Sequence, residues 1–264
     1  MKLPITQVDA FADKPFTGNP AAVMPLETWL DDATLLAIAA ENNLSETAFL
    51  LPDTSGEADH ELRWFTPTSE VVMCGHATLA SGHVLLSADP SLERVRFRTR
   101  KAGILEVGRD GDGYTLELPA WAPEPKPLPE ILAGLGLTSA VETLWHPHRY
   151  GVVVLEDAAA VRAIDPDFRA LATQGDWLTI VTASGDETDI VSRAFAPGGG
   201  IDEDPVTGSA HAVVTPYWAK RLGRDSFSAY QASARGGYVG CRLAGDRVIL
   251  SGRCVTVLEG SFFL

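Results

Sequence analysis

The chain has 264 residues, of which 45% are hydrophobic, and a formal net charge of −14 at pH 7. This length supports one large domain or two ordinary ones with a buried core, and the shortage of Lys and Arg argues against a nucleic-acid or anionic-membrane partner. Three cysteines without disulfide or zinc-ligand spacing, no signal peptide and no apolar run of about eighteen residues predict a cytoplasmic protein without a membrane span.

The first half reads as short strands around one helix. Alternation predicts a strand at 5–11 and another at 21–24, and two aspartates that can act as N-cap precede a helix over 32–42. A second helix over 76–87 begins after a glycine turn, and its early residues are small enough to let neighbouring backbone approach closely. Further strands are expected at 44–51, 62–67, 95–99, 104–107 and 114–118.

Glu46 is an acidic residue inside the strand expected at 44–51. Alternation places it on one face of that strand with Ala48 and Leu50. If this face is buried, desolvation favours the protonated acid and prepares it for proton transfer near neutral pH. The alternative is that the opposite face, which carries Phe49, is the buried one and that Glu46 is solvated. The pattern alone leaves both open.

The second half repeats the plan of the first. Proline is dense in 119–128, which predicts a linker between a first half over 1–118 and a second half over 129–264. The prediction also allows the last strand of the chain to pack against the first half. The elements expected in the second half are a helix near 129–135, strands at 150–155, 177–182 and 190–195, and a helix over 208–222.

Matching segments support an internal duplication. Arg63-Trp-Phe-Thr-Pro67 resembles Arg193-Ala-Phe-Ala-Pro197, and a short loop leads from each to the glycine, Gly75 or Gly208, that opens a helix. A helix start presents unpaired backbone N–H groups and the positive end of the helix dipole, so each start is a candidate anion site. We therefore expect an α+β protein with two pseudo-symmetric halves, each a barrel-like, mostly antiparallel sheet around a central helix.

With these residues the chain resembles the PhzF family, the phenazine biosynthesis-like proteins, within the diaminopimelate epimerase-like fold. The matching segments are Asp9-Ala-Phe, Gly18-Asn-Pro-Ala-Ala-Val, Asn43-Leu-Ser-Glu-Thr-Ala-Phe, Arg63-Trp-Phe-Thr-Pro, Cys74-Gly-His-Ala-Thr-Leu-Ala, Arg193-Ala-Phe-Ala-Pro and Glu203-Asp-Pro-Val-Thr-Gly-Ser-Ala. They span nearly the whole chain in the order of the family. The resemblance implies a site in a cleft between the halves, a homodimer, and an isomerase that acts on a small carboxylate-bearing metabolite without a metal or other cofactor.

The resemblance also implies roles for individual residues. Glu46 becomes the proton shuttle of a general acid–base mechanism, with His76 and Asp204 as the other catalytic residues. The substrate carboxylate would be held by backbone and side-chain donors of Gly75, Gly208 and Ser209. Simpler interpretations exist for three of these, because His76 can cap a helix, and Asp204 and Ser209 are common turn and N-cap residues.

Two other functions stay open at this point. One is a non-catalytic protein of the same fold that binds a small molecule, and the other is an epimerase that depends on Cys74. In the epimerase branch of the fold, two cysteines transfer protons, one at each helix start. Here Cys74 occupies the first position, but Asp204 is taken as the counterpart at the second, which argues against a symmetric two-thiol racemase. His146 and His148 lack an acidic or thiol partner, so no zinc site is expected there.

Overall fold

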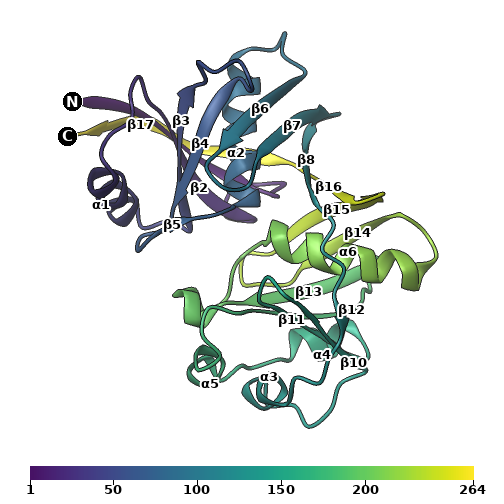
Figure 1. Ribbon diagram of the computed structural model, residues 1–264. Helices are drawn as coiled ribbons and strands as arrows, with labels where there is room; N and C mark the ends of the chain where they lie inside the picture. The colour runs from purple at the N-terminus through teal and green to yellow at the C-terminus, as the bar shows by residue number, and fades with distance from the viewer. The chain divides into compact units, whose positions relative to one another are not determined.

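The computed structural model describes residues 1–264 and forms two compact units (Figure 1). Unit 1 comprises Met1–Glu117 and Ser251–Leu264, and unit 2 comprises Leu118–Leu250. The predicted boundary at residue 118 adjoins the observed one. The C-terminal segment belongs to unit 1, as the prediction of a last strand that can pack on the first half allowed, but the predicted linker needs correction. The proline-rich segment 119–128 is part of unit 2, where strand β9 (Glu124–Pro125) pairs with β10 (Glu142–His146).

Unit 1 is a mixed sheet that surrounds helix α2 (Gly75–Ala88). Its strands are β1 (Lys2–Ala10), β2 (Asn19–Pro25), β3 (Glu46–Pro52), β4 (His60–Phe65), β5 (Glu70–Val71), β6 (Arg94–Thr99), β7 (Ile104–Asp110), most of β8 (Gly113–Pro119), and β17 (Cys254–Phe263). Helix α2 packs against β1, β2, β3, β6, β7 and β17. The predicted arrangement of strands around a central helix is therefore confirmed for this unit.

Helix α2 can occupy this position because the residues of its first two turns are mostly small. Every residue from 75 to 82 is buried, so this part of the helix has no face turned to solvent. Close approach explains the glycine inside it: a Cβ on Gly82 would lie 2.3 Å from Cγ1 of Val107 on β7. A larger residue at position 82 would force β7 away from the helix.

The other helix of unit 1, α1 (Asp32–Asn42), covers the outer face of the sheet. Its Leu35 and Ile38 pack with Phe49 of β3 and Phe65 of β4, while the side chain of Glu46 on β3 contacts α2. Both faces of β3 are thus buried, and Glu46 is only 8% exposed. The interpretation that places Glu46 on a buried face is therefore confirmed. The alternative is correct that the face with Phe49 is buried, but wrong that Glu46 is solvated, because a helix covers each face.

Unit 2 is likewise built from strands and helices, and it has more helices than unit 1. Its remaining strands are β11 (Tyr150–Val154), β12 (Leu178–Ser184), β13 (Ile190–Phe195), β14 (Ser226–Gln231), β15 (Gly237–Ala244) and most of β16 (Arg247–Gly252). Its helices are α3 (Pro129–Gly134), α4 (Ala158–Arg162), α5 (Phe168–Ala172), the 3₁₀ turn η1 (Pro197–Gly199) and α6 (Gly208–Leu222). Helices α3, α4 and α5 pack on Val153, Val181 and Val191, whereas α6 packs against β11 and β15. None of the helices in either unit combines the length and the apolarity needed to cross a membrane.

The order of strand pairings confirms that the two units share one plan. The pairs β2–β3 and β11–β12 are parallel, and the next pairs, β3–β4 and β12–β13, are antiparallel. The pairs β4–β6 and β13–β14 are again parallel, and β6–β7 and β14–β15 are antiparallel. Parallel pairs need a crossover, which α2 supplies between β4 and β6 and α6 supplies between β13 and β14. The two glycine-led helices are therefore equivalent elements.

Candidate active site

Local structure places Glu46 at the first position of β3. Helix α1 ends at Asn42 and is capped by Asn43, which adopts the left-handed conformation (φ 49°) that asparagine tolerates and donates its N–H to Ala39 O at 3.1 Å. The chain then turns into β3, and the side-chain amide of Asn42 donates to Thr47 Oγ1 at 3.0 Å. These contacts orient the start of the strand, so the Asn-Leu-Ser-Glu segment is a helix end followed by a strand start.

The start of α2 brings His76 to this carboxylate. Cys74 is the N-cap residue, Gly75 begins the helix, and His76 follows within the first turn. His76 Nε2 lies 3.0 Å from Glu46 Oε2, and His76 Nδ1 lies 3.5 Å from Cys74 Sγ. Apart from each other, Glu46 Oε2 and His76 Nε2 have no hydrogen-bonding partner. Glu46, Cys74 and His76 thus form a buried acid–imidazole–thiol cluster, with exposed fractions of 8%, 6% and 4%.

Asn19 is a further member of the cluster that sequence reasoning missed. It is fully buried at the start of β2, and its Nδ2 lies 3.1 Å from His76 Nδ1. In the neutral form of the ring, an amide that donates to Nδ1 leaves the proton on Nε2, where it faces Glu46. The only signal in the sequence was the Gly18-Asn-Pro segment, which also reads as an ordinary turn.

The cluster shifts the ionisation of its members. Burial disfavours the imidazolium of His76, but the carboxylate charge of Glu46 and the hydrogen bonds with Cys74 and Glu46 favour it, so the pKa of His76 lies well above its usual value. Burial and then the charge of Glu46 raise the pKa of the Cys74 thiol to about 11, although His76 acts in the opposite direction. Cys74 is consequently a neutral thiol at neutral pH.

This pKa predicts slow alkylation of Cys74 in the folded protein. At pH 7 a thiol with a pKa of about 11 is ~0.01% thiolate, against about 3% for an ordinary cysteine. We expect iodoacetamide to label Cys74 at least ~100-fold more slowly in native protein than in urea, because only the thiolate reacts. Mass spectrometry of timed samples measures both rates. Equal rates would contradict the raised pKa, and faster labelling in the native protein than in urea would show an activated thiol and favour the Cys74-dependent epimerase.

In unit 2, Asp204 belongs to a separate buried polar group before α6. Thr207 Oγ1 donates to Asp204 Oδ2 at 2.5 Å. The amide of Gln231, fully buried on β14, donates to Asp204 O at 2.7 Å and accepts from Thr207 N at 2.9 Å. Gln231 was not predicted, since a lone glutamine in a strand carries no sequence signal. These bonds hold Asp204, which is 9% exposed, at a fixed place in the loop.

The remaining predicted residues of unit 2 lie at the start of α6. Gly208 is buried and opens the helix, and Ser209 is half-buried and hydrogen-bonds with the Tyr150 side chain. The N-cap residue of α6 is Thr207, as Cys74 is the N-cap residue of α2. The counterpart of Cys74 is therefore Thr207 and not Asp204, which lies three residues earlier. The sequence interpretation misplaced this equivalence because the loop before Gly208 is the longer one.

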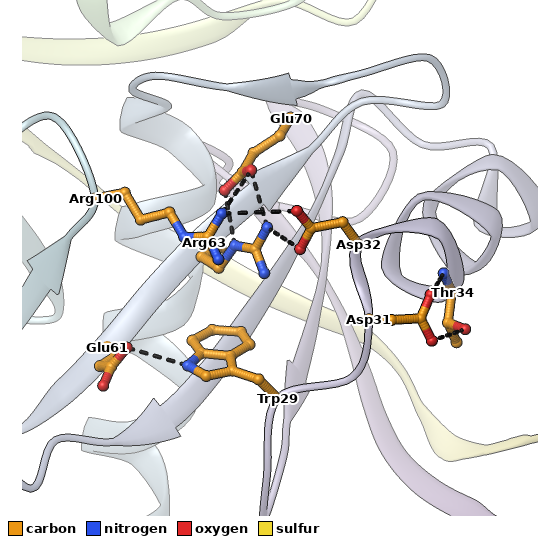
Figure 2. A network of polar contacts seen from close by, with 8 residues as sticks. All are labelled: Trp29, Asp31, Asp32, Thr34, Glu61, Arg63, Glu70 and Arg100. Carbon is orange, nitrogen blue, oxygen red and sulfur yellow. Dashed lines mark hydrogen bonds and ion pairs between the residues drawn. The ribbon is translucent and has the colours of Figure 1, made fainter.

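The loop that leads to α2 is held by a buried arginine. Arg63 on β4 donates from Nε and Nη2 to the carboxylate of Glu70 at 2.7 and 2.9 Å, and from Nη2 to Asp32 Oδ1 at 2.8 Å (Figure 2). Its guanidinium also lies 4.9 Å from the ring of Phe65 and 5.2 Å from that of Trp29. The loop between β4 and α2 is thereby fixed to the sheet just before Cys74.

Unit 2 uses the same device. Arg193 on β13 donates from Nε and Nη2 to the carboxylate of Glu203 at 2.7 and 3.0 Å, and its guanidinium lies 4.9 Å from the ring of Phe195. Glu203 directly precedes Asp204, so the ion pair holds the loop at the candidate site residue. The repeated Arg-x-Phe-x-Pro segment is thus a structural element that anchors the approach to each central helix.

Two duplicated α+β units, each built around a helix whose start carries polar side chains, define the diaminopimelate epimerase-like class of fold. Within this class the chain belongs to the PhzF family: the PhzC-PhzF family model, described as phenazine biosynthesis-like protein, matches residues 8–260. An uncharacterised isomerase of Pseudomonas aeruginosa is 47% identical over 266 residues that cover 100% of both chains. The relatives named isomerases support an isomerase activity for this chain and leave its reaction open.

Solved structures agree with this assignment. The crystal structure of a PhzF family protein from Enterococcus faecalis is similar to this chain with 45% identity and a TM-score of 0.92, over 100% of both chains. A hydroxyproline epimerase from Agrobacterium vitis has a TM-score of 0.62 and 13% identity, and covers 98% of this chain and 92% of its own. The second similarity concerns the fold alone, and it confirms the predicted fold class.

Proposed function

We propose that this chain is a cofactor-independent isomerase that shifts a proton on a small carboxylate-bearing metabolite, with Glu46 as the general acid and base. The observation that carries the proposal is the buried Glu46 carboxylate, 3.0 Å from a single polar partner, His76 Nε2. A carboxylate group can accept a proton from carbon and, as the carboxylic acid, return it, which is the chemistry that a proton shift requires.

The proposed reaction uses Glu46 twice. The carboxylate removes a proton from one carbon of the substrate and, as the carboxylic acid, returns it to another carbon. One C–H bond breaks and one forms, so the reaction is balanced without an oxidant or a second substrate. While Glu46 is ionised, His76 donates its Nε2–H to the carboxylate. This hydrogen bond fixes the position of the Glu46 side chain. General acid–base catalysis of this kind contributes about 10²- to 10⁴-fold to the rate.

For unit 2 we propose a role in binding substrate. Asp204 is held by Thr207 and Gln231, and a carboxylate in a fixed position can orient an amino or hydroxyl group of a ligand. The backbone N–H groups at Gly208 and the hydroxyl of Ser209 are donors suited to a carboxylate. Homodimer formation and a cytoplasmic location stay predictions that rest on the resemblance to the family and on the sequence.

The test is proton exchange with solvent. We expect the protein in D₂O to introduce deuterium at carbon into at least one member of a panel of small unsaturated amino and hydroxy carboxylates, and to form an isomer of equal mass in H₂O. Nuclear magnetic resonance and mass spectrometry detect both. A carboxylate that raises the melting temperature yet emerges without deuterium would instead support the non-catalytic binding protein.

A further inference from the structure

The cluster at the start of α2 contains the donor set of a metal site. Glu46, Cys74 and His76 offer one oxygen, one sulfur and one nitrogen atom, all within 4.8 Å of one another, and all three residues are buried. Thiolate, imidazole and carboxylate are the ligands of zinc sites in proteins, and three protein ligands leave a fourth tetrahedral position for water or a substrate. We propose that these three residues bind a thiophilic divalent cation such as Zn²⁺, and that the bound cation prevents proton transfer by Glu46.

The distances fit a shared ion after small side-chain rotations. Zinc bonds of about 2.0–2.3 Å put tetrahedral ligand atoms about 3.3–3.8 Å apart. The observed separation between His76 Nε2 and Glu46 Oε2 is 3.0 Å. The thiol of Cys74 lies 3.5 Å from the other ring nitrogen, Nδ1, so an ion bound by Nε2 and Oε2 needs this thiol to rotate towards Nε2. One donor atom of each of the three residues lies within 4.8 Å of the others.

Asn19 supplies the outer support that such a site needs. A histidine that ligates a metal through one nitrogen hydrogen-bonds through the other, which fixes the orientation of the ring. The side-chain amide of Asn19 lies 3.1 Å from Nδ1, the nitrogen that stays free when Nε2 binds the ion. After the amide rotates, its oxygen can accept the Nδ1 proton.

The charges of the filled site balance. Cys74 binds as the thiolate and His76 as the neutral ring, so each releases one proton to solvent, and Glu46 binds as the carboxylate. The dication thus cancels two negative charges, and a buried site without net charge avoids the cost of an isolated buried ion. Mg²⁺, which requires octahedral oxygen ligands, is not suited to a site with one carboxylate.

Only the blocking of proton transfer rests on the proposed function, because it requires Glu46 to be the acid and base. Cation binding itself depends on the three side chains alone. The two parts can therefore fail separately: a protein without isomerase activity can still bind the cation, and an active isomerase can turn out not to bind it.

Titration of the purified protein with Co²⁺ alone tests binding, because a cobalt–thiolate bond has a charge-transfer absorption band. We expect a band that saturates at one Co²⁺ per chain, disappears on addition of Zn²⁺ and does not form with Mg²⁺. Cys74→Ser removes the band, and the control Cys254→Ser retains it. Glu46→Gln keeps the band but weakens binding by about tenfold or more. The absence of the band in the wild-type protein, or its survival in Cys74→Ser, would overturn the proposal.

A second variant covers the case that Cys74→Ser does not fold, which circular dichroism reveals. The double variant Cys241→Ser with Cys254→Ser leaves Cys74 as the one thiol in the chain. A band that persists in the double variant assigns the thiolate to Cys74, and a band lost there contradicts the site. For a carboxylate that the wild-type protein isomerises, stoichiometric Zn²⁺ should stop deuterium exchange, and a chelator should restore it. Full exchange with Zn²⁺ bound would refute the blocking role alone.

Discussion

Replacement of Glu46 by glutamine lowers deuterium incorporation by about 10²- to 10⁴-fold, which is the contribution expected from the loss of a general acid and base. The amide has the size of the carboxylate and can still accept the Nε2–H of His76, so the fold of the cluster is retained. It cannot take up a proton from carbon at neutral pH. Exchange rates measured by nuclear magnetic resonance at saturating substrate give the ratio directly.

Two further variants make the Glu46 result specific. Glu41→Gln changes an exposed glutamate on α1 and should leave the exchange rate within about twofold of wild type. Glu46→Asp retains an acid but withdraws it by one methylene, so an intermediate rate is expected if position as well as chemistry matters. Undiminished exchange by Glu46→Gln, in a protein with an unchanged melting temperature, would remove Glu46 from the mechanism.

The elements that the sequence predicted well are those with local signals. Helix α1 was expected over 32–42 and spans the same residues, because Asp31 caps its first turn and Asn43 ends it in the left-handed conformation. Helix α6 was likewise expected at its observed bounds, since Gly208 opens its first turn and Gly223 follows its last. The duplication could also be read from sequence, because Arg63 and Arg193 anchor equivalent loops in both units.

The features that could not be predicted depend on contacts between distant segments. Glu46 is buried because α2 covers it, and His76 of α2 is 30 residues further along the chain. The alternation of residues in the strand does not indicate this contact. The amides of Asn19 and Gln231 complete two polar clusters, but an isolated amide has no distinguishing spacing. Strand β17 belongs to unit 1 because it pairs along β1, and such pairing of the two ends of a chain has no local signature.

Replacement of Arg63 by methionine is expected to lower the free energy of unfolding by about 3 kcal/mol. The Arg63 side chain is 2% exposed and binds Glu70 and Asp32, so its removal leaves two carboxylates without their charged donor. These carboxylates are 29% and 67% exposed and can recover some hydration, which places the cost at the low end for a broken buried ion pair. Methionine retains much of the packing against Phe65, so the loss reports mainly on the ion pairs.

Arg94→Met is the matched control, because Arg94 is 69% exposed and lies 3.7 Å from Glu106 in an exposed ion pair. Urea unfolding should show a change within about 0.5 kcal/mol for this variant. Arg193→Met removes the equivalent ion pair with Glu203 in unit 2, where the arginine is 12% exposed, so a loss similar to that of Arg63→Met is expected. A loss for Arg63→Met no larger than for Arg94→Met would show that the repeated arginine does not anchor the loops. A lower free energy of unfolding in both Arg63→Met and Arg193→Met would show that the same ion pair anchors the loop before the central helix in each unit.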